Sequence, residues 1–122
     1  MPDTVDAADQ MRAFALGLPG AHEDFPWGER AWKVDGKVFV FCGREEDLAD
    51  KLSFSVKLKH TAVDVLDRPE ARPTGYGLGR HGWVSFTFPA GEVPEVRLLL
   101  AWIDESYRAV AKKRRVKELD AR

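Results

Sequence analysis

Three adjacent side chains near the amino end, His22, Glu23 and Asp24, are of the types that bind metals or transfer protons. Consecutive residues of an extended segment point to opposite faces, so the three cannot converge on one ion. No second pair of ligand-type residues follows at the spacing that zinc sites use. We therefore expect a polar loop without a metal, in which Glu23 or Asp24 pairs with a base such as Arg30 or Lys33.

Nucleophilic catalysis needs a serine or cysteine with a base within hydrogen-bonding reach. No motif that exposes a nucleophile at a turn surrounds Cys42, Ser53, Ser55 or Ser85. Cys42 is the only cysteine and ends an apolar run, so we expect a buried thiol, no disulfide and no thiolate zinc site. The sequence predicts a protein that is not an enzyme and that has no cofactor.

The segment from Gly77 to Gly82 matches the string G-x-G-x-x-G of dinucleotide-binding loops. In that motif a helix follows the glycines, and its amino end receives the pyrophosphate. Here an alternating, strand-like segment follows from Trp83, so we do not expect a nucleotide site. We interpret the glycines as a turn or wing tip from which Arg80 and His81 could reach a ligand.

Two alternating segments could present basic and aromatic side chains together. In the first, Lys51 and Lys57 flank serines on one side of a strand whose other side is apolar. In the second, Trp83 shares its side with Ser85 and Thr87. If the strands lie together, lysines beside an indole would suit phosphates and a stacked base. The alternative is that the lysines keep the sheet soluble and Trp83 packs under a loop or helix.

The carboxyl end is strongly basic, although the net charge of the chain is only −1. Residues 108–122 hold seven bases and two acids, whereas residues 1–30 hold six acids and two bases. Such a tail can supply nonspecific affinity for phosphates, or it can be a solvated helix end. The cations concerned are Lys112, Lys113, Arg114, Arg115 and Lys117.

The elements that must position these residues alternate between helical and extended patterns. A helix is predicted over residues 4–17, with Asp3 or Thr4 as its cap. A hairpin follows, because Asp35-Gly36 between apolar strands favours a type I′ turn. Pairing outward from that turn puts Trp32 opposite Phe39 and Arg30 opposite Phe41, which we expect to form a core face. The segment His22–Gly28 between helix and hairpin is expected to be irregular.

Later segments extend the alternation. We expect a strand over residues 51–57 and a short helix that a capping box opens at Thr61 and that ends near Arg68. An extended piece over residues 71–76 and a strand over residues 83–88 come next. The last helix begins at Pro94 and shows one apolar stripe. We expect the basic residues 112–122 to extend it.

Several short motifs resemble those of the MmcQ/YjbR family over residues 10–111. They are Leu18-Pro19-Gly20 with Glu23–Gly28, the Trp32–Phe39 hairpin, Ser55-Val56-Lys57, Gly75-Tyr76 with His81-Gly82-Trp83, and Ile103–Tyr107. The resemblance implies an α+β fold: a two-layer α/β sandwich with an antiparallel five-stranded sheet in the order α-β(3)-α-β(2)-α. The implied fold is similar to that of secretion chaperones, and the resemblance also implies double-wing DNA binding. The glycine-rich 76–82 loop and the basic tail depart from the family pattern.

We therefore expect one domain over residues 1–111 and a tail over residues 112–122. Its predicted partner is DNA, bound with low specificity through Lys51, Lys57, Arg80, Trp83 and the five tail cations. One alternative is a protein-interaction module. The other is a small-ligand or enzymatic site at Glu23, Trp27, Lys57 and Tyr76. A single cysteine and the lack of a long apolar run favour a cytoplasmic protein without a membrane partner, and the oligomeric state is left open.

Overall fold

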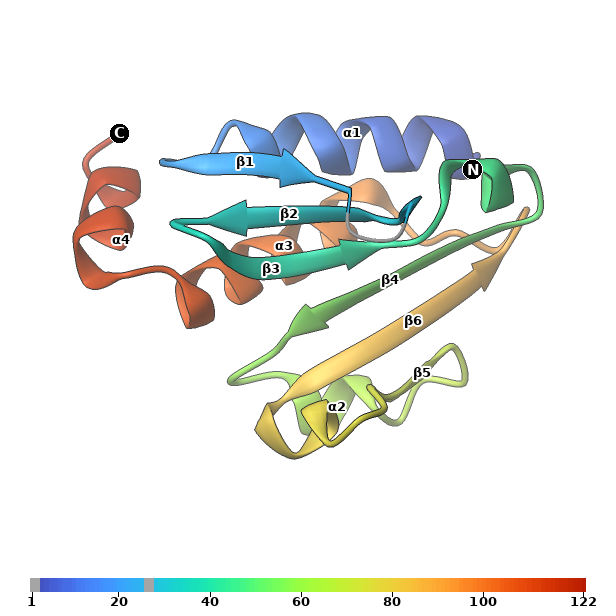
Figure 1. Cartoon of the computed structure of the whole chain (residues 1–122). Helices are drawn as coiled ribbons and strands as arrows, with labels where there is room; N and C mark the ends of the chain where they lie inside the picture. Colours follow the sequence, from blue (N-terminus) through green and yellow to red (C-terminus); the bar gives the residue numbers. More distant parts are fainter. Residues whose placement is uncertain (1–2, 26–27) are drawn as a thin grey trace.

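The computed structural model describes residues 3–25 and 28–122 of the chain. It has the α+β character that the sequence predicts, with helices on one side of an antiparallel sheet (Figure 1). In chain order the elements are α1 (Thr4–Leu16), β1 (Ala21–Asp24), β2 (Arg30–Val34), β3 (Lys37–Cys42), the 3₁₀ turn η2 (Glu45–Ala49), β4 (Lys51–Lys57), α2 (Ala62–Val65), β5 (Ala71–Pro73), the 3₁₀ turn η3 (Leu78–His81), β6 (Trp83–Pro89), α3 (Val96–Val110) and α4 (Lys113–Asp120).

The described sheet has six strands in the order β1-β2-β3-β4-β6-β5, and each neighbouring pair is antiparallel. The expectation of five strands was wrong because β1 lies in the segment that we read as an irregular polar loop. It pairs with β2 from Ala21 opposite Val34 to Asp24 opposite Ala31. An edge strand needs few apolar residues, so its polar sequence hid it.

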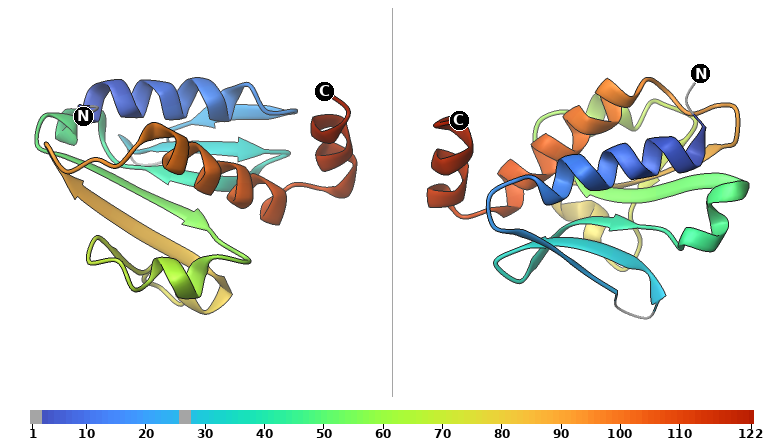
Figure 2. Two further views of the ribbon diagram at one scale, coloured as in Figure 1. Left: turned by 180° about the vertical axis from the view of Figure 1, so that it is seen from behind. Right: turned by 90° about the horizontal axis from the view of Figure 1, so that it is seen from above.

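Helices α1 and α3 cover one face of the sheet, and Figure 2 shows them side by side on that face. Asp3 caps α1, as predicted, by accepting a hydrogen bond from the Asp6 amide at 2.7 Å. The central part of the core is aromatic: Trp102 of α3 stacks on Phe86 of β6, with ring centroids 4.3 Å apart. No helix of the described chain is long and apolar enough to cross a membrane.

The β2–β3 hairpin forms the predicted turn, with a positive φ at both Asp35 (50°) and Gly36 (82°). The predicted pairing beyond it was wrong, because the register shifts next to Trp32 and brings Val40 opposite that residue. A bulge adds one residue to one strand, and two-by-two counting from a turn cannot include it. Phe41 consequently leaves the core face and lies with Trp83 on the other face, 5.5 Å between ring centroids.

A serine hydroxyl of α3 takes the place of a hydrogen bond between β3 and β4. These strands pair from Cys42 opposite Phe54 to Val40 opposite Val56, and the next pair would join Phe39 to Lys57. There the Ser106 hydroxyl accepts from the Lys57 amide at 2.8 Å and donates to the Phe39 carbonyl. Beyond this point the two strands diverge, as Figure 1 shows.

A glutamate of α3 also holds the start of α2. The Glu105 carboxylate accepts from the amides of His60 (2.9 Å) and Thr61 (3.2 Å) and from the Thr61 hydroxyl (2.9 Å). The predicted capping box at Thr61 was therefore wrong, since its hydroxyl donates to Glu105 and makes no cap bond of its own. A carboxylate from a distant helix performs the capping role.

Residues 112–122 do not extend the last helix, contrary to our expectation. The backbone is extended at Ala111 and Lys112, with ψ of 151° and 152°, and α4 starts anew after them at the end of the molecule (Figure 2). Arg115 of α4 binds both carboxylate oxygens of Asp35, at 3.0 and 3.2 Å. Because Asp35 lies in the β2–β3 turn, this ion pair attaches α4 to the sheet.

Further contacts attach α4 to the loop after α1. The guanidinium of Arg115 lies so close to Gly20 that a Cβ there would be 2.7 Å from it, and Gly20 has a φ of +71°. Arg122 donates to the Gly17 carbonyl at 2.8 Å. Arg108 of α3 joins Asp120 of α4 at 2.9 Å. The carboxyl-terminal segment is thus a docked part of the fold.

Replacing Ser106 with alanine should destabilise the fold by about 1–3 kcal/mol, because a partly buried amide and a buried carbonyl would lose their partners. Urea denaturation followed by circular dichroism measures this loss. Ser53→Ala is the matched control, since Ser53 makes a single long bond of 3.4 Å to Thr87 and should cost at most about 0.5 kcal/mol. Equal effects of the two substitutions would refute the role of Ser106.

Replacing Asp35 with asparagine should release α4 while keeping the turn, because asparagine also adopts the left-handed conformation readily. We expect faster hydrogen–deuterium exchange of amides in residues 112–122 at neutral pH, and no change in α1. Arg115 lowers the pKa of Asp35, so the wild-type contact should persist in mildly acidic solution and fail only as the pH falls through that lowered value. Glu92→Gln is the charge-matched control, and unchanged exchange in Asp35→Asn would contradict docking through this pair.

Candidate nucleic-acid interface

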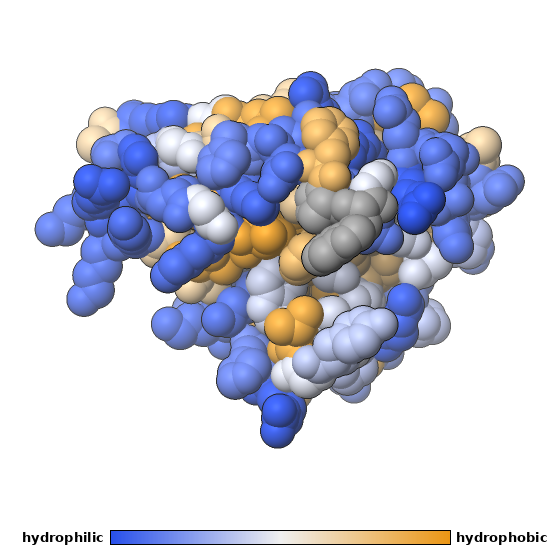
Figure 3. All heavy atoms as spheres, in the orientation of Figure 1, coloured by the Kyte–Doolittle hydropathy of each residue, from blue (hydrophilic) through white to orange (hydrophobic). Residues whose placement is uncertain are grey.

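The sheet face opposite α1 and α3 carries the two segments that the sequence singled out. Strands β4 and β6 pair along their whole length, with Ser55 opposite Ser85 and Lys57 opposite Trp83. The expectation that their polar sides share one surface is confirmed. Figure 3 views this face and shows residues of intermediate hydropathy across its lower centre, between hydrophilic margins.

Hydroxyl groups form a hydrogen-bonded row on this face. Ser85 bonds to Ser55 at 2.7 Å and to Thr74 at 2.8 Å, and Arg72 of β5 donates to Thr87 at 3.2 Å. None of these bonds within the described chain joins a hydroxyl to a histidine or a carboxylate. The row therefore has no base to activate a nucleophile, and it can act as a set of hydrogen-bond donors and acceptors.

Trp83 does not offer the open ring that base stacking requires. It exposes 8% of its surface, and the Phe41 ring lies against it. The expectation of a stacking or wedge residue at this position was wrong, and the alternative of a packed indole holds. The bulge in the β2–β3 hairpin is the physical reason, because it turns Phe41 onto this face.

Two cations flank the hydroxyl row. Lys57 ends β4 and is half-buried, and Arg72 of β5 lies opposite Ser85 on the other side of β6. Neighbouring strands are about 4.8 Å apart, so the backbones of Lys57 and Arg72 are about two strand spacings, or about 10 Å, apart across the sheet. Lys51 lies on the same side of β4, as predicted, but at the opposite end of the strand, about 20 Å from Lys57. Sequence reasoning missed Arg72, whose strand has only three residues.

Arg80 lies in the loop between β5 and β6. This loop is closed at its base by a bond from the Thr74 amide to the Trp83 carbonyl at 3.0 Å. Strand β6 follows η3 directly, which agrees with the interpretation of the glycines as a turn. Arg80 therefore projects from a loop that adjoins the same face.

Acidic groups lie on the other half of this face. Asp24 of β1 pairs with Lys33 at 2.7 Å, which confirms one of the expected ion pairs. Glu29 lines a hollow of about 150 Å³ with Ser53 and Ser55. Strands β4, β5 and β6 contain no aspartate or glutamate. On the β1–β3 half the cation Lys33 is thus paired with an acid, whereas the cations of β4 and β5 have no acid on their own strands.

The tail cations differ in their availability. Arg115 is held by Asp35 and by Glu118, and Arg114 lies 4.0 Å from Asp35. Lys112, Lys113 and Lys117 are exposed. Arg115 binds Asp35, so these lysines lie near the β2–β3 turn, at the same end of the sheet as Lys57 (Figure 1).

The small-ligand site that we considered at Glu23, Trp27, Lys57 and Tyr76 does not form from its described members. Glu23 and Lys57 lie three strands apart on opposite faces, and Tyr76 lies beyond β5 at the far edge. Trp27 is outside the described residues. The sequence does not reveal the strand order, so the motifs grouped residues that lie far apart in the sheet.

Glu23 has a structural role on the helix-covered face. It accepts two hydrogen bonds from Arg12, at 2.8 and 2.9 Å, and one from the Trp32 indole at 2.9 Å. The bonds from Arg12 hold the pKa of Glu23 below its ordinary value. An ionised carboxylate with three donors fastens α1 to the sheet and is a poor proton donor.

Cys42 is buried, as predicted, and burial raises the pKa of its thiol. Its sulfur accepts a hydrogen bond from Arg30 at 3.4 Å, which opposes that shift without overcoming it. A protonated, covered thiol is unreactive.

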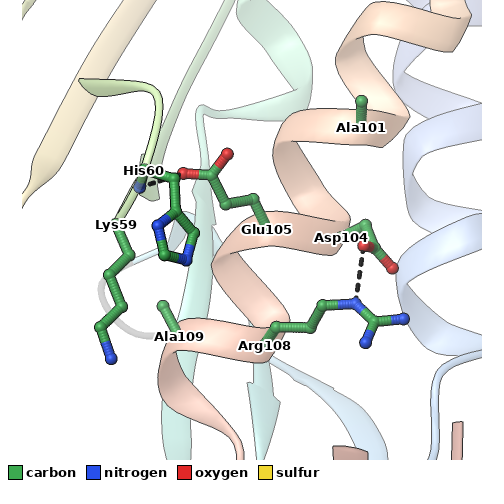
Figure 4. A pocket seen from close by; sticks show the side chains of 7 residues that line it. All are labelled: Lys59, His60, Ala101, Asp104, Glu105, Arg108 and Ala109. Carbon is green, nitrogen blue, oxygen red and sulfur yellow. Dashed lines mark hydrogen bonds and ion pairs between the residues drawn. The ribbon is translucent and has the colours of Figure 1, made fainter. Parts of the chain in front are cut away.

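A hollow of about 370 Å³ lies between α3 and the residues before α2, where sequence reasoning expected no site (Figure 4). Its two carboxylates and its arginine are hydrogen-bonded. Arg108 binds Asp104 at 2.9 Å, and Glu105 accepts from the His60 amide. No carboxylate of this lining lacks a donor, so the hollow has the chemistry of a structural junction between α3 and the β4–α2 segment.

Comparison with known proteins identifies the family of the chain. No curated protein matches the chain significantly. The YjbR family profile matches residues 16–109, which span the sequence from the end of α1 almost to the end of α3. The match excludes α4 and includes the glycine-rich 76–82 loop. The chain belongs to the YjbR family.

Proposed function

We propose that this protein is a non-catalytic nucleic-acid-binding domain that contacts phosphates with the β4–β6–β5 half of its helix-free face. The observation that carries the proposal is the placement of Lys57 and Arg72 on either side of a hydroxyl row, on strands that have no acid. Arg80 on the adjoining loop adds a third cation. Phosphate oxygens are acceptors for all of these groups.

Low sequence specificity follows from the same chemistry. Contacts to phosphates position a protein on nucleic acid, whereas contacts to base edges read its sequence. The described face presents short hydroxyls and flexible cations, and Trp83 is covered. The exposed lysines of the carboxyl-terminal segment add positive charge at the same end of the sheet, beside the β2–β3 turn.

The absence of a catalytic role rests on the state of the acids, the thiol and the hydroxyls. Glu23 is ionised and triply bonded, the thiol of Cys42 is buried, and the serines bond to one another. These candidates for acid and nucleophile are therefore engaged in structural contacts.

A protein-interaction module is the second candidate function, favoured by an apolar surface near α2. Val63 is 81% exposed there, next to a hollow of about 310 Å³ lined in part by Val65, Leu98 and Trp102. A partner that bound at this surface would co-purify in high salt, because apolar contacts are not screened. Nucleic acid would be released under the same conditions.

Binding should be visible by fluorescence anisotropy with labelled oligonucleotides over a salt series, and affinity should fall as salt rises. Lys57→Gln with Arg72→Gln should weaken binding about tenfold and reduce the slope of log K against log salt by about 1.5. Arg44→Gln with Arg97→Gln removes the same charge elsewhere and should change both values little. Binding that is absent, or that salt does not affect, would exclude this function.

A further inference from the structure

Tyr76 combines full exposure with a costly backbone conformation. Its side chain is completely accessible to solvent, and its φ of 60° lies in the left-handed region that bulky residues rarely adopt. Glycine or asparagine would fit this position with less strain. Neither its burial nor its backbone conformation therefore stabilises the fold. Residues held in such rarely populated backbone conformations cluster at binding sites.

The loop that carries Tyr76 is braced at its base. The Gly79 amide donates to the Thr74 carbonyl at 3.0 Å, and the Leu58 amide donates to the Gly82 carbonyl at 2.9 Å. A Cβ on Gly82 would lie 2.9 Å from the Leu58 carbonyl oxygen, so the loop approaches the end of β4 closely. A braced loop holds its tip in place, which reduces the ordering cost of binding there.

The cation Arg80 lies beside the segment that carries Tyr76. The Arg80 guanidinium is 3.2 Å from where a Cβ of Gly77 would be, directly after Tyr76 in the chain. An aromatic face and a guanidinium on one tip match the two parts of a nucleotide, a flat base and a charged phosphate. Arg72, on the strand that leads into the loop, continues the line of positive charge.

We propose that Tyr76 stacks on an unpaired base, so that the ligand of this face is single-stranded nucleic acid, with Arg80 and Arg72 on the flanking phosphates. The inference rests on the function proposed above and narrows it. In a duplex the base faces are stacked within the helix and closed to a side chain, whereas a single strand exposes them. Trp83 is covered, whereas Tyr76 offers an accessible ring on the loop that carries Arg80.

Three ligands and two substitutions test this inference: a labelled oligothymidylate, an abasic strand of equal length and a duplex, each measured by anisotropy. Wild-type protein should bind oligothymidylate about five- to a hundredfold more tightly than the abasic strand, which measures stacking. Tyr76→Asn deletes the ring while suiting the left-handed backbone, and it should abolish that preference without changing abasic binding. Tyr76→Phe retains the ring and should retain the preference.

The two proposals fail in different ways. Equal binding of oligothymidylate by wild type and Tyr76→Asn, or tighter binding of the duplex, would overturn the stacking role while salt-dependent abasic binding still supports the phosphate contacts. A wild-type protein that binds none of the three ligands would overturn both. Thermal unfolding of the two variants establishes that they are folded.

Discussion

The arrangement of the sheet depends on how two backbone groups, the Lys57 amide and the Phe39 carbonyl, find hydrogen-bond partners where β3 and β4 separate. Ser106 meets that need with one hydroxyl, which accepts from Lys57 and donates to Phe39. Because the bond comes from α3, the strands can diverge while the backbone remains satisfied. The divergence separates a β1–β3 half with paired acids from a β4–β6–β5 half with cations and hydroxyls. The same serine holds the backbone of Lys57 in place at the end of β4.

The basic character of the carboxyl end serves architecture as well as charge. Arg115 donates hydrogen bonds to Asp35, and Arg108 donates to Asp104 and Asp120. These bonds hold α4 against the hairpin and α3. The lysines of the same segment stay exposed. Arginine is suited to the first role because its planar donors match both oxygens of a carboxylate. A count of charges cannot separate these two uses.

Local patterns predicted those parts of the fold that local physics determines. The caps and apolar stripes gave α1 and α3, Asp35-Gly36 gave the turn, and alternation gave β4 and β6 with their shared polar face. The errors arose where contacts between distant segments determine the structure. The polar strand β1 pairs with β2, a bulge moves Phe41 to the other face of the sheet, and Asp35 binds Arg115. The covered state of Trp83 follows from that bulge. Tyr76 was named as a candidate site residue, but its grouping with Glu23 required a strand order that no pattern contains.

The hydroxyl row has a property that rigid side chains lack. Between Ser55, Ser85 and Thr74 either oxygen of each bond can be the donor, because a hydroxyl rotates about its C–O bond. The row can therefore reverse its polarity as a unit, offering a hydrogen at one end or a lone pair at the other, while every heavy atom stays in place. The row can thus present either a hydrogen or a lone pair to a contacting group without moving its heavy atoms.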